Sequence, residues 1–404
     1  MSSSEEPPPD SVVAAQPSAE DAEAAATEAI NALLNRADQG SDDTPSLKRK
    51  HADKDDISLT LKDYGRAFLR LGDPFTPVDD IIQHGIFIET TEEVDYPKMN
   101  KRQREVFDRN TESWEILWRM IGQSFREQMI ILTKNRKLRR RAAKTITTGI
   151  NASRGEDAST IKKNIINYLL ADTSAALDPP LQPSTRVNRG RHHTVTARLT
   201  CPAKRVPDEN TFKGIATGAI PVTGKSFRRF FYPDDWTYVK DPVTKESNIM
   251  DNLFEGHLMI RVAKCILQGP SSALKGPGAG RGDQGNAAKI GARAITKRLM
   301  GYIGIQTLFG ISDLETWKQV DGTFDYEEFY WTIVSLFDDD DNAQVLEHFN
   351  HQVFGNAAGN VKPSTSASDA AASDDDEESD LDAYKALRAA KKARLDAAAA
   401  TTTQ

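Results

Sequence analysis

A basic segment near the middle of the chain is the clearest chemical feature of the sequence. Seven of the eleven residues from Lys134 to Lys144 are Lys or Arg. Cations at this density attract phosphates and other anions, and they neutralise the backbone charge of nucleic acids. The candidate binding residues for nucleic acid or another polyanion are therefore Lys134, Arg136, Lys137, Arg139, Arg140, Arg141 and Lys144.

The spacing of this segment predicts a helix that carries charge on all sides, which could not be buried without many partners. An alternative interpretation is a solvated helix end, because cations near a helix C-terminus interact favourably with the helix dipole. The rest of the chain argues against a dedicated nucleic-acid binder, since such proteins usually carry a large basic excess. We calculate a net charge of only about +4 for residues 57–355, from -7 for the whole chain, -8 for residues 1–56 and -3 for residues 356–404.

A second basic stretch lies between Arg186 and Arg198 and contains the pair His192-His193. This composition indicates a loop that contacts anions, or a disordered segment, rather than a pair of metal ligands. Arg189 and Arg191 are added to the candidate polyanion-binding residues on this basis.

Two shorter basic clusters resemble nuclear import signals. The chain start is acidic and Pro-rich without an apolar stretch, and no segment approaches the length of a membrane span. The two cysteines, Cys201 and Cys265, lie far apart and form neither a disulfide framework nor a zinc motif. We expect an intracellular protein with a nuclear location and no membrane contact; the import candidates are Lys48, Arg49, Lys50, Lys391, Lys392 and Arg394.

Two glycine motifs suggest phosphate binding but do not meet its requirements. Gly218–Ser226 resembles a P-loop with one residue too many between its glycines, and Pro221 removes a backbone donor. Gly280–Gly285 fits GxGxxG, yet a helix and a Gly/Pro-rich stretch precede it where a dinucleotide site needs a strand. A connector is the better interpretation of both segments.

Two further patterns suggest metal binding. Asp321–Phe329 reproduces only the second half of an EF-hand loop, so a turn followed by an Asp-capped helix is preferred to a calcium site. His348 and His351 lie three residues apart, without the glutamate or the third ligand of a zinc motif. We therefore predict no catalytic residue, cofactor or metal site and a non-enzymatic protein, although a site assembled from distant residues stays open.

Apolar residues recur at helical spacing through most of the central chain. One long helix is predicted over 100–147, with a bend near Gly122 or Lys134. The Ala-rich run after Ser18 could form a short helix, which would be marginal alone in water. Further helices are predicted over 59–71, 77–83, 159–170, 248–267, 286–309, 326–337 and 343–354.

These patterns predict a mainly α fold, an irregular multi-helix domain with long loops, flanked by disordered acidic tails. Residues 1–56 are assigned to the N-terminal tail, and 57–355 to the helical body. The body has helical halves at 57–170 and 208–355 joined by a loop at 171–207, and we expect one shared core. Residues 356–404 are assigned to an acidic tail with a short Ala-rich basic helix.

Several segments of the body combine aromatic residues with Gly and Pro. They are Tyr64–Phe68, Asp73–Phe75, Phe230–Pro233, Phe254–Leu258, Pro270–Ala273, Phe324–Tyr330 and Phe349–Gly355. Together they resemble a family of mushroom-forming fungi that is known only as a domain of unknown function. The resemblance implies a fungal source and a helical domain, and it would cover Ile57 to Gly355. It implies no activity, cofactor or binding residue, and the Gly-rich stretch Gly276–Gly285 departs from it as a loop insertion.

The leading hypothesis is a non-enzymatic helical interaction protein that binds nucleic acid or an acidic protein through its basic helix and loop. The second hypothesis is a protein–protein scaffold controlled through the acidic segment Asp374–Asp380, with Ser368, Ser373 and Ser379 as phosphorylation candidates. The third is an enzyme whose site is not visible in the sequence. The oligomeric state, and any shielding of the basic helix by the acidic tails, stay open at this stage.

Overall fold

The computed structural model describes residues 18–39, 59–91, 94–279, 285–338 and 342–360. Over these ranges the fold is mainly α, which confirms the predicted fold class. The α-helices are α1 (Ala19–Gln39), α2 (Leu61–Leu71), α3 (Val78–Thr90), α4 (Lys101–Ile121), α5 (Gln123–Ile131), α6 (Arg136–Asn164), α7 (Thr194–Thr200), α8 (Glu209–Ala216), α9 (His257–Gln268), α10 (Asn286–Lys289), α11 (Lys297–Ile311), α12 (Tyr326–Ser335) and α13 (Ala343–Phe354).

Short 3₁₀ helices and one small sheet complete the regular structure of the described residues. The strands β1 (Val320–Asp321) and β2 (Phe324–Asp325) pair antiparallel, and Gly322 turns between them with φ +60°. The 3₁₀ helices are η1 (Tyr96–Lys98), η2 (Ile165–Tyr168), η3 (Gly190–His192), η4 (Arg229–Phe231) and η5 (Pro270–Ser272).

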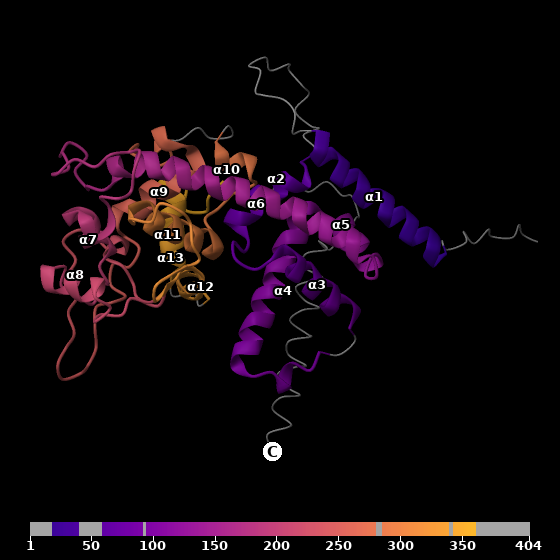
Figure 1. Cartoon of the computed structure of the whole chain (residues 1–404), viewed down its shortest axis with the longest axis horizontal. Helices are drawn as coiled ribbons and strands as arrows, with labels where there is room; N and C mark the ends of the chain where they lie inside the picture. Colours follow the sequence, from indigo (N-terminus) through magenta and orange to yellow (C-terminus); the bar gives the residue numbers. More distant parts are fainter. Residues whose placement is uncertain (1–17, 40–58, 92–93, 280–284, 339–341, 361–404) are drawn as a thin grey trace, which may run out of the picture.

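The helix α6 organises the molecule, because it runs along the long axis and has different partners at its two ends (Figure 1). It packs against α1, α2 and α3, with α2 crossing it at Gly149, and its last turns lead through η2 toward α9 and α11. Helices α1 and α5 lie toward one end of the long axis and α7 and α8 toward the other, while α3 and α4 lie below its middle in this view. The buried apolar residues of the described chain form one cluster that includes members from both ends.

Two glycines allow α2 and α6 to cross with their backbones in contact. A Cβ atom at Gly65 would lie 2.1 Å from the carbonyl oxygen of Ile146, and one at Gly149 would lie 1.9 Å from that of Lys62. Such distances leave no room for a side chain at either position. The crossing therefore depends on both residues being glycine.

Local capping residues fix several helix starts. Thr60 accepts from the Asp63 N–H at 3.2 Å, and the Asp63 side chain accepts from the Thr60 N–H at 3.1 Å, which forms a capping box for α2. At the start of α1, Ser18 Oγ accepts from the Asp21 N–H at 3.2 Å. Asp325 caps α12 as predicted, and α13 has the predicted limits.

The predicted long helix over 100–147 is divided into three helices, and the two breaks lie where a bend was predicted, at Gly122 and around Lys134. Gly122 ends α4 with φ +122°, a left-handed conformation that only glycine adopts easily. A turn over 132–135 then separates α5 from α6, and α6 continues through the separately predicted helix at 159–170 as far as Asn164. The basic segment consequently lies at the start of a helix rather than at its end.

The structure corrects further boundaries. The first is the disordered tail predicted for 1–56, since 19–39 form α1, which buries Ala26, Ile30 and Leu34 against the rest of the chain. The 171–207 segment is not only a loop, because it contains η3 and α7. The remaining corrections are that α3 passes Gly85, that α9 begins only at His257, and that 286–309 is divided into α10 and α11.

A histidine that pairs α3 with α4 should make stability depend on pH. The Thr111 hydroxyl donates to the Phe107 carbonyl, so it accepts from His84 Nε2 at 2.8 Å, and the imidazole is neutral with its proton on Nε2. Burial lowers the pKa of His84 from 6.5 to about 4. Below pH 6.5 the unfolded chain therefore binds a proton at His84, whereas the native protein binds this proton only near pH 4.

We expect the free energy of unfolding to fall between pH 6.5 and 4 through this residue. From pH 7 to 5 the loss is at most about 2 kcal/mol, and smaller because the ring keeps some contact with water. Urea unfolding of the wild type and of His84→Gln, each at about pH 7 and about pH 5, measures this loss of stability. The wild type should lose more stability than the variant over this interval; equal losses would show that His84 titrates alike in both states.

Candidate nucleic-acid interface

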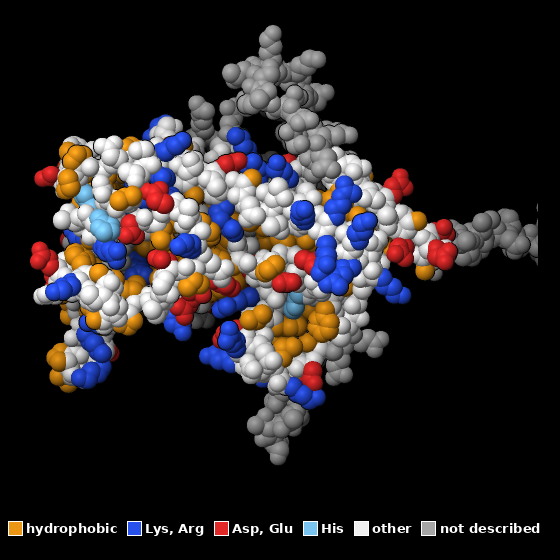
Figure 2. Space-filling view, viewed as in Figure 1, with side chains coloured by type: hydrophobic (Ala, Val, Ile, Leu, Met, Phe, Trp, Pro, Cys, Tyr) orange, Lys and Arg blue, Asp and Glu red, His pale blue; other side chains and the backbone are white. Residues whose placement is uncertain are grey.

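The basic segment forms one exposed side of α6 near its start. With 3.6 residues per turn, positions 136, 137, 140, 141 and 144 share one side of the helix, so the predicted charge on all sides is wrong. Figure 2 shows Lys and Arg side chains gathered over the end of the molecule where α5 and α6 meet. The exposed cations are Lys134 in the preceding turn and, on the helix, Arg136, Lys137, Arg140, Arg141 and Lys144.

The opposite side of the same turns is apolar and holds the helix in place. Leu138, Ala142, Ala143 and Ile146 are buried in the shared core. Asn135 begins the helix, since its side-chain oxygen accepts from the Leu138 N–H at 3.2 Å. The amphipathic pattern thus fixes which side of α6 presents its cations to solvent.

Arg139 does not belong to this surface, so its prediction as a polyanion-binding residue is wrong. It is 7% exposed, and its Nε donates to Asp79 Oδ1 on α3 at 3.1 Å. Arg140 Nε lies 3.7 Å from the other oxygen of Asp79. Arg139 therefore ties α6 to α3 and is not available to a partner.

The position of the cations at a helix start changes their electrostatics. A helix N-terminus carries partial positive charge, so cations there are unfavourable and anions favourable. The first turn of α6 contains no acidic residue. The predicted stabilisation of these cations by the helix dipole is therefore wrong, and an anionic partner would relieve their repulsion.

Arg189 is also corrected, because it is a buried structural residue. It is 1% exposed and donates to the carbonyl oxygens of Gly310 at 2.8 Å and Lys162 at 2.7 Å. Burial lowers its pKa to about 10, which leaves it charged at neutral pH. Arg186, also buried, donates to the Leu314 and Ala158 carbonyls at 3.1 Å each. These two arginines connect the last turns of α6 to the end of α11.

The neighbouring residues of this basic stretch divide between surface and core. Arg191 is exposed, as the prediction of an anion-contacting residue requires. His193 is buried; its Nδ1 accepts from the Val195 N–H at 3.2 Å and caps α7, and its Nε2 lies 2.7 Å from the Pro179 carbonyl. His192 Nε2 lies 3.3 Å from Asp313. The histidine pair thus serves local structure.

A buried polar cluster that the sequence did not indicate joins α2, α6 and α11. Arg70 donates to Asp157 through Nε at 2.9 Å and Nη2 at 2.7 Å. The Tyr302 hydroxyl donates to the same carboxylate at 2.7 Å and accepts from Gln306 at 3.1 Å. Arg70 and Asp157 are only 6% and 7% exposed, so this is a buried ion pair. Their separation of 87 residues gave no local signal.

A second polar cluster joins α4 to α11 and α12. Arg298, 1% exposed, donates to Glu112 at 2.8 Å, and Lys297 lies 3.2 Å from the same carboxylate. The guanidinium carbons of Arg298 and Arg109 each lie 4.3 Å from the ring centroid of Trp331. These contacts attach the N-terminal helices to the C-terminal part of the described chain.

The metal-like patterns also have structural explanations. Glu328, the last ligand of the half EF-hand, accepts from the Gly224 N–H at 3.0 Å and lies 3.6 Å from Lys225. A carboxylate of the same chain therefore accepts from a backbone N–H of the P-loop-like segment, where a phosphate would have to bind. His348 and His351 are exposed on α13. Across the residues that the structure describes, no group of three metal-ligating side chains converges.

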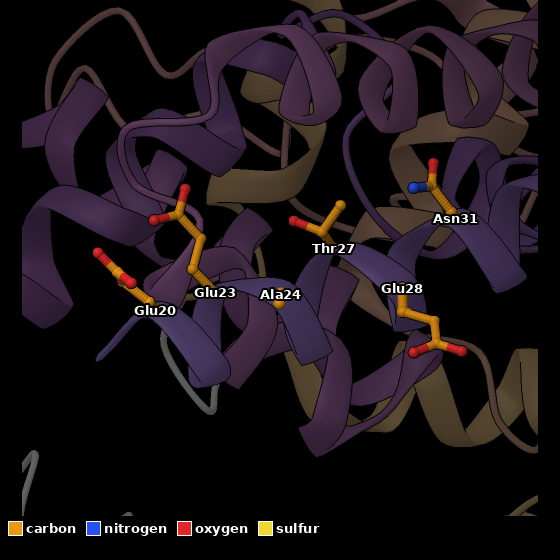
Figure 3. Close-up of a pocket in the computed structure, with 6 residues that line it drawn as sticks. All are labelled: Glu20, Glu23, Ala24, Thr27, Glu28 and Asn31. Atoms are coloured by element: carbon orange, nitrogen blue, oxygen red, sulfur yellow. The ribbon is translucent and has the colours of Figure 1, made fainter. Parts of the chain in front are cut away.

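A pocket of about 540 Å³ lies along α1 (Figure 3). Its six lining residues all belong to this helix and contain carboxylates without a neighbouring His, Cys or Lys. This set does not form an acid–base or nucleophilic pair. Its residues are Glu20, Glu23, Ala24, Thr27, Glu28 and Asn31.

Several predicted elements lie outside the described residues. These are both import clusters, at 48–50 and 391–394, the acidic segment 374–380 with its serines, and most of the GxGxxG segment. The nuclear and scaffold hypotheses therefore stay predictions. In the described chain, no helix is both long and apolar enough to cross a membrane.

Comparison with known proteins gives one match. Residues 148–354, about half of the chain, match a family of unknown function, DUF6698. The match begins within α6 and ends with α13, so it is shorter than the expected range of 57–355 and leaves out the basic segment. No curated protein and no solved structure matches the chain.

Proposed function

The chain belongs to the DUF6698 family, whose function is unknown, and we propose that it is a non-enzymatic interaction protein that binds nucleic acid or a similar polyanion. The binding site in this proposal is the α6 surface, which consists of Arg136, Lys137, Arg140, Arg141 and Lys144. The observation that carries it is that these five cations share one exposed side of a helix at its positive end.

The geometry of the α6 surface suits a phosphate backbone. Consecutive turns of a helix are about 5.4 Å apart, so Arg136, Arg140 and Lys144 form a row about 12 Å long. Their side chains are long and flexible enough to reach successive phosphates, which lie several ångströms apart along a strand. This arrangement supports contact with the backbone and no particular base sequence.

The acidic helix α1 belongs to the same proposal. It packs on α5 and α6 through its apolar side, while Glu20, Glu23 and Glu28 are exposed. Acids at this end of the molecule repel a polyanion and therefore limit its affinity for the α6 surface. The proposal further includes a nuclear location and a fungal source, which rest on the import clusters and on the family resemblance alone.

Neutralising the α6 surface should weaken binding to nucleic acid and make it less sensitive to salt. In the triple variant Arg136→Gln, Lys137→Gln, Lys144→Gln, three cations that can contact phosphates are lost. We expect the slope of log affinity against log salt to decrease by about 3 in magnitude for a duplex. Fluorescence anisotropy of the full chain with labelled duplex and single-stranded oligonucleotides, between 50 and 200 mM salt, measures this.

A matched control removes the same charge elsewhere. Lys275, Lys289 and Arg293 are exposed and lie outside the α6 surface, so the triple change of these residues to Gln should leave the salt slope within experimental error. If both variants changed the salt slope equally, the interaction would depend on net charge alone and not on the α6 surface. If the wild-type protein binds neither oligonucleotide, nucleic acid is excluded and an acidic protein segment becomes the partner to test.

A further inference from the structure

A second concentration of positive charge lies in the part of the chain that matches the family. Residues 186–229 contain ten Lys or Arg and only two Asp or Glu. Three of these cations are buried structural residues, but others face solvent. The exposed group defines the α7–α8 surface, which consists of Arg191, Lys204, Arg205 and Lys213.

Backbone pairing fixes the part of this surface that carries Lys204 and Arg205. The Ala203 N–H donates to the Phe227 carbonyl at 2.8 Å, and the Arg229 N–H donates to the Cys201 carbonyl at 3.0 Å. The Arg229 guanidinium donates to the Arg205 carbonyl at 3.3 Å. The segment after α7, which carries Lys204 and Arg205, is therefore fixed beside the equally basic segment 225–229.

A buried charge lies beneath the same pairing. Arg228 is 4% exposed, its Nη1 donates to the Thr200 carbonyl at 3.3 Å, and its guanidinium carbon lies 4.8 Å from the Phe324 ring centroid. Both of these partners are uncharged. Because a carbonyl and a ring do not cancel the charge, Arg228 adds to the positive potential around the segment that follows α7.

The two basic surfaces lie at opposite ends of α6. Arg136 and Lys162 are 26 residues apart on this helix, a distance of about 39 Å at 1.5 Å per residue. The hydrogen bond from Arg189 to the Lys162 carbonyl ties the stretch before α7 to the far end. Figure 1 accordingly places α7 and α8 at one end of the long axis and the start of α6 toward the other. This distance is several times the Debye length of about 8 Å, so the surfaces act independently.

We infer that the α7–α8 surface is a second phosphate-binding surface, and that one molecule holds two nucleic-acid segments at once. The inference rests on the proposed function of the α6 surface and adds a second, separate site to it. One segment lies along the start of α6, and the other lies over the segment that follows α7. The protein thereby links nucleic-acid segments instead of only coating one.

Binding stoichiometry with a short duplex tests this inference. A hairpin with eight base pairs is about 27 Å long, which is too short to reach both surfaces. Titration of the full-length protein at low salt, followed by native mass spectrometry or calorimetry, should give two hairpins per wild-type molecule. The triple variant Lys204→Gln, Arg205→Gln, Lys213→Gln should bind one hairpin, and so should the α6-surface triple variant.

The outcomes separate the inference from the proposed function. One hairpin on both the wild type and the α7–α8 variant, with none on the α6 variant, would overturn the second site and leave the α6 surface intact. No hairpin on any form would reject the proposed function itself. The control variant at Lys275, Lys289 and Arg293 should keep both hairpins; loss of one there would show that the second hairpin is held by general charge, which also overturns the inference.

Discussion

The variant Asp157→Asn is expected to unfold with about 3–5 kcal/mol less free energy than the wild type. This substitution removes the charge that compensates Arg70 inside the protein, where both side chains are less than one-tenth exposed. It also places an amide N–H₂ group where two donors, Arg70 and Tyr302, need an acceptor. Urea unfolding followed by circular dichroism measures the loss.

The neighbouring pair of Arg66 and Glu156 provides a control on the same two helices. Arg66 donates to Glu156 through both terminal nitrogens, at 2.6 and 2.8 Å, but the Glu156 side chain is 54% exposed. Glu156→Gln should therefore cost less than about 1 kcal/mol. The double variant Arg70→Met with Asp157→Leu should regain part of the loss, because it leaves no unpaired charge. Equal costs for Asp157→Asn and Glu156→Gln would contradict the role given to burial.

The variant Gly149→Ala is expected to lose about 3 kcal/mol of stability, at the upper end of the usual cost of overpacking. The added methyl group would lie 1.9 Å from the Lys62 carbonyl oxygen, so it must separate the backbones of α2 and α6. Neither helix can relieve this clash by rotating a side chain. Chemical denaturation measures the change, and a lower midpoint without a change in the denaturant slope would show that the fold itself persists.

Gly155→Ala, six residues later in α6, is the matched control. A Cβ atom at Gly155 meets nothing within 4 Å, so alanine should stabilise the helix by about 0.5–1 kcal/mol. Gly65→Ala should resemble Gly149→Ala, and the two together should cost less than their sum, because the first change already separates the helices. A stabilising effect of Gly149→Ala would mean that α2 and α6 do not touch at this crossing.

The sequence indicated several helices because their signals are local. The capping residues Thr60 and Asp325 lie within three residues of the N–H groups that they bind, and Gly72 and Gly269 mark the ends of α2 and α9. The spacing of the apolar residues also indicated which side of each helix is buried. Such signals depend on neighbouring residues only, so they can be read before the fold is known.

The sequence indicated a bend near Gly122 or Lys134, but not that a helix ends at each of these positions. The apolar spacing continues from α4 through α5, and the break depends on Gly122, a residue that helices also tolerate in their interiors. The burial of α1 likewise depends on its contacts with α2, α5 and α6, which lie far along the chain. An isolated helix of this composition is marginal, and tertiary contacts decide whether it forms.

The sequence by itself determined the charge of this protein: a run of cations at 134–144, a second run within 186–229, and acidic segments at both ends. The tertiary structure decided which of these charges a partner could reach. Arg139 and Arg189 have the same side chain as Arg136 and Arg191, but Asp79 and the carbonyls of Lys162 and Gly310 hold them inside. The reason is physical, since charge belongs to each residue, whereas burial and pairing depend on which distant atoms the fold brings within a few ångströms.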